Sequence, residues 1–402
     1  TTLYTMFGGV QAVTWTDVKQ MVLIIIGLGV CIFIIVSNFP ADVSVSEGLF
    51  LAGAAGKLNT IETSFDLTEK YTIWSGTIAA LFLFLSYFGC DQSQVQRFLT
   101  AKSVSQGRTS LLMSAFLKIP MQFLILLIGI FVFIFYQFQA PPMIFNQVAA
   151  DKAVSAKASE YGALESKYKQ IHETRSKAAT EFVNAKKENN TDSIAKTKSA
   201  YLKANQDFSA MRKEATEFVK TANKNSSFSD VNYVFPTFVI KYMPMGVIGL
   251  IIAAIFAAAM SSISSELNAL ATASTIDFYR RHFNKEGTDA EYVRFGRIAT
   301  FIWGMFACVV AIYATNLGSL IEVVNKFGSF FYGSLLGVFV LAIAVKRARA
   351  RGAFFGLLFG IASVWIASNF TEIEFLWFNV VGCLVTVGVG YLISLTVSED
   401  SK

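Results

Sequence analysis

Long apolar blocks constrain the fold of this chain more than any other feature of its sequence. A helix needs roughly 20 mainly apolar residues to cross a bilayer, and several blocks reach that length. Hydrophobic residues make up 54% of the chain, and they lie in blocks rather than in one helical stripe. We therefore predict a polytopic membrane protein with eight spans, at about 10–37, 73–99, 106–137, 244–279, 292–315, 319–346, 352–369 and 375–397.

Basic residues gather in alternate short loops between these spans. Twelve Lys and Arg residues fall on one side, whereas the short loops of the other side carry mainly acids. Because cytoplasmic loops are enriched in Lys and Arg, the first span is expected to run outward and the C-terminus to be cytoplasmic. The expected location is a plasma membrane, most simply a bacterial inner membrane.

Cysteines and histidines are few and scattered. The four cysteines lie in or beside apolar spans without paired spacing, and both histidines lie in charged loops. This distribution offers neither a metal cluster nor a nucleophile–base pair. We expect no enzymatic activity, no cofactor and no nucleic-acid partner.

The segment 139–232 is hydrophilic and differs from the rest of the chain. Its apolar residues keep 3-4 spacing in two halves, which the polar stretch 188–192 separates and which Arg175 interrupts once. We predict an extracytoplasmic coiled-coil hairpin, with Thr191 or Asp192 capping the second helix. Its role stays open between a solvated spacer or cap and an arm that binds an unknown partner.

A line of serines interrupts the apolar helix at 244–279. Ala258, Ser261, Ser262 and Ser265 share one helical face, and Ser264 lies beside Ser261. Polar groups near the centre of a bilayer need partners or a purpose. A cluster of neutral oxygens is suited to a hard, weakly bound cation such as sodium.

Two charged residues lie inside predicted spans. Asp17 is roughly two turns into the first span, and Lys19 does not share its helical face. A carboxylate at that depth is costly unless it meets a cation or water, which favours an ion-linked role. Lys118, in the third span, either holds a polar ligand or extends its ammonium to the interface.

The second span and the sixth span also contain polar interruptions. In the second span the apolar run ends at Tyr87, and Gly89 and a polar stretch follow. This pattern predicts a discontinuous transporter helix, the alternative being an ordinary helix end at the interface. In the sixth span, Asn325 and the glycine at 328 are the better candidates for a site.

Together these segments resemble the sodium/solute symporter family, whose best-known members are the sodium–glucose cotransporters. The matching pieces are residues 8–20, then Asp91-Gln92 with 96–97 and 101–103, and the serine helix that ends in 276–279. The resemblance implies an all-α LeuT-like fold with two inverted five-helix repeats. The chain begins at Thr1 without an initiator methionine, and is interpreted as an N-terminally truncated fragment that starts at the fifth core helix.

That resemblance divides the chain into four regions. Residues 1–138 correspond to core helices five to seven, and 139–232 to an extracytoplasmic insert. Residues 233–346 correspond to core helices eight to ten, and 347–402 to additional C-terminal helices.

The resemblance also implies binding residues and a function. The expected activity is sodium-coupled import of a small organic solute (sugar, sugar acid, carboxylate or similar) by alternating access. Sodium is the coupling ion, and lipid surrounds the spans. The alternative is a transporter-like sensor domain of a signalling protein. The implied main sodium site is Ala258, Ser261 and Ser262; the second is Asp17, Ser261, Ser264 and Ser265; and the solute-lining residues are Phe84, Tyr87, Phe88, Lys118 and Asn325.

Overall fold

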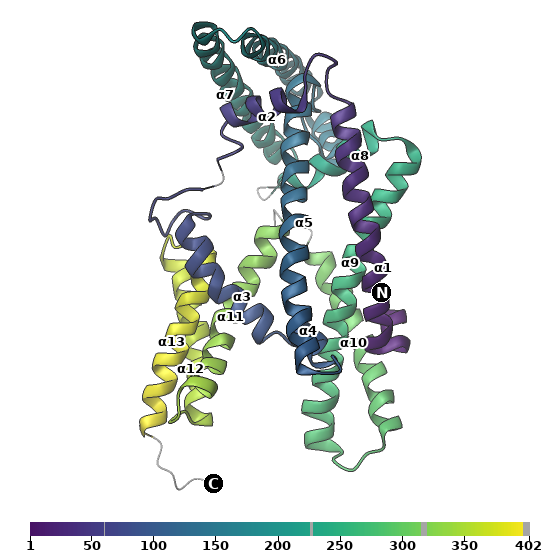
Figure 1. The fold of residues 1–402 in the computed structure, drawn as a ribbon, viewed down its shortest axis with the longest axis vertical. Coiled ribbons are helices and arrows are strands. Elements are labelled where there is room, and N and C mark those ends of the chain that lie inside the picture. Colours follow the sequence, from purple (N-terminus) through teal and green to yellow (C-terminus); the bar gives the residue numbers. More distant parts are fainter. Residues whose placement is uncertain (60, 226–227, 315–319, 397–402) are drawn as a thin grey trace. The chain divides into compact units, whose positions relative to one another are not determined.

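The regular secondary structure of the parts that the computed structural model describes is helical throughout (Figure 1). These parts exclude residues 60, 226–227, 315–319 and 397–402, and the side chains of residues 10–12, 314 and 320–326. The chain divides into two compact units. The first consists of Thr1–Asn59 and Met113–Ser319, and the second of Thr60–Leu112 and Leu320–Lys402.

Seven helices in the described residues are long and apolar enough to cross a membrane, so the chain is a multi-pass membrane protein. They are Val13–Ser37, Val104–Phe138, Met245–Phe283, Asp289–Tyr313, Phe327–Ala344, Ala350–Phe370 and Phe375–Thr396. Each corresponds to one predicted span. The remaining predicted span, 73–99, is divided, and its apolar helix Ser75–Gly89 is shorter than these seven.

The divided segment contains three helical pieces. A π-helical stretch, Ser75–Ala79, continues into α3 (Ala80–Gly89), and a separate helix, α4 (Gln92–Leu99), follows. The Asp91 carboxylate accepts a hydrogen bond from the amide of Ser93 at 2.8 Å and so caps α4. This break confirms the predicted discontinuity after Gly89.

The membrane core of the first unit is built on α1 (Thr2–Ser37). It packs against α9 (Met245–Ala273) and α10 (Asp289–Ala314), and a π-helical stretch, Ser274–Phe283, extends α9. A second cluster joins α1 to the end of α5 (Val104–Phe138) and to α8 (Val234–Tyr242). With nine residues, α8 is too short to cross a membrane.

The hydrophilic insert forms the predicted antiparallel hairpin, with α6 (Gln147–Lys187) beside α7 (Thr191–Ala222) (Figure 1). Its interior holds the aromatic residues of the 3-4 pattern, and α2 (Val45–Ala54) packs against it. The predicted cap is wrong. Asn190 caps α7 by accepting a hydrogen bond from the Ser193 amide at 3.2 Å, because α7 already begins at Thr191.

The second unit contains a closely packed group of three helices, α11 (Leu320–Ala344), α12 (Ala350–Phe370) and α13 (Phe375–Thr396). Glycines at positions 352, 356 and 360 lie on one face of α12. A Cβ atom added at Gly356 would lie 2.6 Å from the carbonyl oxygen of Thr386 on α13. The backbones of α12 and α13 therefore touch, as at other small-residue contacts in membranes.

Candidate functional site

The centre of the candidate ion site is a contact between α1 and the serine line of α9. The hydroxyl of Ser261 donates a hydrogen bond to Oδ1 of Asp17 at 2.6 Å. These residues lie 244 positions apart in the sequence, so only the packing of α1 on α9 brings them together. The structure thus places the predicted carboxylate and the predicted serine face in direct contact.

Two further serines surround the same point of α9. Ser264 and Ser265 are buried, and their hydroxyls donate to the backbone carbonyl of Ser261 at 2.9 and 3.0 Å. A serine hydroxyl has one proton to donate and two lone pairs that accept. Both protons are therefore directed into the helix backbone. The predicted second sodium site therefore consists of three serines from about one turn of α9 and the Asp17 side chain of α1, which contacts one of them.

The predicted main sodium site occupies an adjoining stretch of α9. The hydroxyl of Ser262 donates to the carbonyl of Ala258 at 3.3 Å, and both residues are exposed. Its hydrogen bond has the same form as those of Ser264 and Ser265. Ala258, Ser261 and Ser262 thus present a carbonyl and two hydroxyls from a single helix, which makes this site the more open of the two.

The oxygen atoms at these two sites are hard ligands. They come from one carboxylate, several hydroxyls and backbone carbonyls, which suit hard cations rather than soft transition metals. No cluster of three or more His, Cys, Asp or Glu residues that would hold a metal occurs in the part of the chain that the structure describes.

Two features of α1 are not evident from the sequence pattern alone. The hydroxyl of Tyr4 donates to the carbonyl of Met260 at 3.1 Å, one residue before the serine line. The helix α1 is interrupted at Gly9, whose φ of 56° and ψ of −155° favour glycine. The pair Gly8-Gly9 was the only sequence signal for this break. A cavity of about 410 Å³ lies beside it, lined by residues of α1, α9 and α10.

The predicted solute-lining aromatic residues lie together on α3. Tyr87 and Phe88 are edge to face with ring centroids 5.0 Å apart, and Phe84 lies 6.3 Å from Phe88. Ser86 is buried beside them, and its hydroxyl donates to the carbonyl of Tyr332 on α11 at 2.7 Å. No role was predicted for Ser86 from the sequence, although a hydroxyl group in an apolar helix indicates a hydrogen-bond partner.

The other two predicted lining residues lie on α5 and α11. Lys118 is exposed on α5, two residues before Pro120, and belongs to the first unit, whereas α3 belongs to the second. Asn325 lies on α11, but its side chain is outside the described residues. Their place in a solute site stays a prediction.

Comparison with known proteins supports the same fold and family. The model of the sodium:solute symporter family matches residues 1–161 and 214–360. A solved structure, the substrate-bound outward-open state of a Na+-coupled sialic acid symporter, aligns with a TM-score of 0.68 at 22% identity. That alignment covers 99% of this chain and 65% of the other, and it confirms the predicted LeuT-like, all-helical fold class.

Similar sequences include two bacterial symporters. The sodium/sialic acid symporter NanT of Aliivibrio fischeri is 27% identical over 97% of this chain and 61% of its own length. The sodium/glucose cotransporter of Vibrio parahaemolyticus is 24% identical over 89% of this chain and 53% of its own length. The chain therefore spans little more than half to three-fifths of these relatives. Only residues 162–213 fall between the segments that the family model matches, a narrower gap than the predicted insert at 139–232.

Proposed function

Because the chain belongs to the sodium:solute symporter family, we propose that it works in the sodium-coupled import of a small organic solute by alternating access. The observation that carries this proposal is the contact between Asp17 and Ser261 at 2.6 Å. It places a carboxylate against a row of hydroxyls inside membrane helices. A carboxylate in that setting is stable when a cation accompanies it.

The proposal assigns two sodium ions to the two groups of residues on α9. The main site takes Ala258, Ser261 and Ser262, and the second takes Asp17 with Ser261, Ser264 and Ser265. The shared Ser261 couples them, because its side chain contacts Asp17 while its carbonyl accepts from the two buried serines. Binding at either site then changes the geometry that the other ion meets.

Two ions and one ion supply very different driving forces. Each inward sodium charge gains about 2.3 kcal/mol per 100 mV, and a tenfold concentration ratio adds about 1.4 kcal/mol. Two ions therefore provide about 7 kcal/mol, which concentrates a neutral solute about 10⁵-fold, whereas one ion gives about 500-fold. The coupling number is thus measurable from accumulation alone.

We assign the solute to the sugar acids within the broader class of small organic solutes. Two relatives, at 27% and 26% identity, are named sodium/sialic acid symporters. On this proposal Phe84, Tyr87 and Phe88 form an aromatic wall beneath the solute, and Lys118 and Asn325 supply polar contacts. The ammonium of Lys118 provides the positive charge that a carboxylated sugar needs.

The proposed orientation follows the basic loops. The hairpin α6–α7 lies outside, the C-terminus lies in the cytoplasm, and the membrane is the bacterial inner membrane. Core helices five to seven occupy 1–138, core helices eight to ten occupy 233–346, and additional helices occupy 347–402. The hairpin at 139–232 remains a candidate arm for an extracytoplasmic partner.

The experiment that tests this function is sodium-dependent uptake by Ser262→Ala. Loss of one sodium ligand is expected to lower uptake at limiting sodium by about tenfold or more, since one charge-assisted contact is removed. Ser363→Ala is the matched control, because its hydroxyl likewise bonds a carbonyl of its own membrane helix, at 2.7 Å. Undiminished, still sodium-coupled uptake by Ser262→Ala would overturn the assignment.

A further inference from the structure

A buried arginine in the hairpin has no acidic partner among the described residues. Arg175, which interrupts the apolar pattern of α6, is only 3% exposed. Its guanidinium lies 3.5 Å from the ring centroid of Phe208 and donates one hydrogen bond, to the carbonyl of Tyr136. Its Nε has no hydrogen-bond partner. Buried charges are ordinarily paired, so this arrangement is incomplete as it stands.

The contact with Tyr136 explains only part of this arrangement. Tyr136 lies in the last turn of α5, where the carbonyls have no donor within the helix and where a positive charge is favourable. His172 also lies beside this carbonyl, with its Nε2 at 3.4 Å. A helix cap uses one edge of the guanidinium and leaves Nε without a partner. Burial lowers the pKa of Arg175 to about 10, because the guanidinium charge loses its contact with water.

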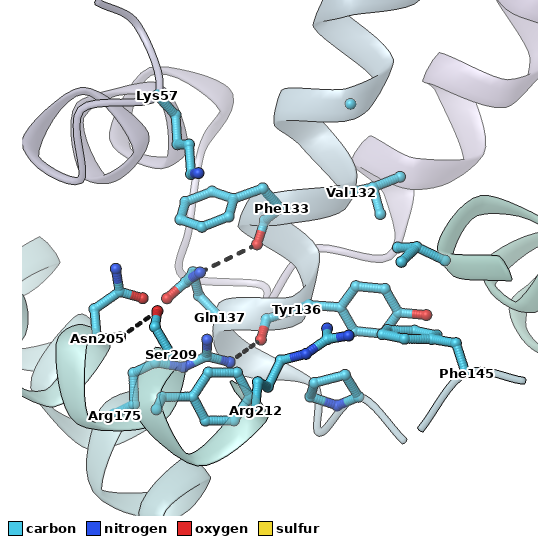
Figure 2. Close-up of a pocket in the computed structure, with 14 residues that line it drawn as sticks. Lys57, Val132, Phe133, Tyr136, Gln137, Phe145, Arg175, Asn205, Ser209 and Arg212 are labelled. Atoms are coloured by element: carbon cyan, nitrogen blue, oxygen red, sulfur yellow. Dashed lines mark hydrogen bonds between the residues drawn. The ribbon is translucent and has the colours of Figure 1, made fainter. Parts of the chain in front are cut away.

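A cavity of about 270 Å³ adjoins this arginine, between α5, α7 and the loop after α2 (Figure 2). Two more cationic side chains, Lys57 and Arg212, line it, together with the neutral hydrogen-bonding groups of Gln137, Asn205 and Ser209. No Asp or Glu is among the lining residues that the structure describes.

The net charge of the cavity is positive after its ion pairs are counted. The guanidinium of Arg212 lies 3.2 Å from the buried carboxylate of Asp230, which neutralises its charge. The same carboxylate accepts a hydrogen bond from the Phe145 amide. Lys57 reaches over the ring of Phe133, 5.4 Å from its centroid. Lys57 and Arg175 therefore contribute two charges that no described carboxylate balances.

We propose that this cavity binds an oxyanion of the phosphate type, either free or as the headgroup of a phospholipid. Guanidinium and ammonium groups are the usual phosphate ligands, and the side-chain amides of Gln137 and Asn205 carry further N–H donors. The cavity also reaches Gly129, Val132 and Phe133 of α5, which lie inside a membrane-spanning helix. That apolar side suits the glycerol and acyl portions of a lipid whose headgroup lies at Arg175. The site is separate from the sodium face and does not depend on transport.

The experiment measures thermal unfolding of the delipidated, purified protein against inorganic phosphate, with chloride keeping the ionic strength constant. Phosphate is expected to raise the melting temperature saturably. Lys57→Gln should weaken its apparent affinity about tenfold, because one charge-assisted contact is lost, and Arg175→Gln should abolish the response. Lys213→Gln is the matched control, since it removes the same charge from an exposed position next to Arg212. If Arg175→Gln does not fold, the exposed Lys57 still carries the test.

A second arm distinguishes the two sources of phosphate. The protein is placed in nanodiscs of phosphatidylglycerol or of phosphatidylcholine, and retained lipid is counted by native mass spectrometry. A lipid ligand predicts retention of phosphatidylglycerol that falls about tenfold in Lys57→Gln but not in Lys213→Gln. Binding in either arm with this variant pattern supports the site. If neither ligand binds saturably, or if Lys57→Gln binds as the native protein does, the proposal is wrong.

Discussion

Two helix pairs of this protein lie in the membrane and are held together in different ways. Between α12 and α13, glycine backbones touch. Three polar atoms beside this contact are buried without partners: Oγ of Ser334 on α11, and Oδ1 of Asn379 and Oγ1 of Thr386 on α13. Between α1 and α9, the contacts are hydrogen bonds from Tyr4 and Ser261, and a Cβ on Gly27 would still fit, 3.4 Å from Ala254. Close backbone packing holds the first pair, whereas the second pair combines apolar packing at Cys31, Ile35 and Ile251 with these polar contacts.

The difference indicates which pair can change during the proposed transport cycle. Lipid provides no hydrophobic force between helices, so α12 and α13 depend on van der Waals contact, which any separation forfeits at once. The contact of Asp17 with Ser261 can be exchanged for a cation without such a loss. We therefore expect α12–α13 to behave as a rigid unit and α1–α9 to respond to sodium.

The most damaging change should be a side chain placed in the glycine contact. Gly356→Val puts a Cβ atom 2.6 Å from the carbonyl of Thr386, where backbone rather than a flexible side chain must move. We expect the free energy of unfolding to fall by about 4 kcal/mol or more, so that the variant does not fold. Size-exclusion chromatography and thermal melting measure this result.

Gly388→Val is the control for this prediction. It makes the same substitution in α13, where a Cβ atom meets nothing within 4 Å, and should leave the melting temperature almost unchanged. A folded Gly356→Val with the stability of the control would show that packing does not hold this pair.

The next largest effect is expected at the polar contact. Asp17→Asn removes the charge that faces Ser261 and with it the second sodium ion. Coupling should fall from two ions to one, which lowers the accumulation ratio from about 10⁵ to about 500-fold and the Hill coefficient for sodium toward 1. Uptake measured against sodium concentration and membrane potential reads both quantities.

The control here is Asp289→Asn, which makes the same change in the exposed first turn of α10. Its sodium dependence should match the native protein. An unchanged Hill coefficient in Asp17→Asn would remove the second ion from the proposal while leaving the main site intact.

The sequence predicted the parts of this comparison that depend on periodicity. Apolar blocks located the membrane helices, 3-4 spacing located the hairpin, and helical geometry placed Ser261 and Ser265 on one face. These features need only local geometry. The meeting of Asp17 with Ser261 was expected from family resemblance, because no pattern within one helix specifies its neighbour.

The remaining features depend on contacts between distant segments. The touching backbones at Gly356 and the bond from Ser86 to Tyr332 arise from helix packing, which spacing along one helix does not encode. The break in α1 falls at Gly9, but the neighbouring Gly8 tolerates the same backbone conformation, so the sequence does not specify which of the two is broken. The cap of α7 was misplaced because residues 188–192 are all suited to a turn or cap.

The smallest predicted effect is in the α6–α7 hairpin, outside the membrane. There the question is whether polar contacts respond to pH more than packing does. Burial, and then the charge of Arg175, lowers the pKa of His172 in α6. The unfolded chain, with a histidine pKa of about 6.5, then binds more protons than the folded one between the two values. The contribution of neutral His172 to the stability of the hairpin is therefore fully present above about pH 6.5. It is lost as the pH falls through the lower folded pKa.

Hydrogen–deuterium exchange of α6 and α7 between pH 7 and 5, corrected for intrinsic rates, measures this loss. Protection should fall in the native protein and should change less in His172→Gln, which has no charge to acquire. The acids with lowered pKa, Glu47, Glu62 and Asp66, titrate below this window and do not contribute. His282→Gln, at an exposed position, should follow the native protein. An equal loss of protection in His172→Gln would mean that protonation of His172 does not cause the loss.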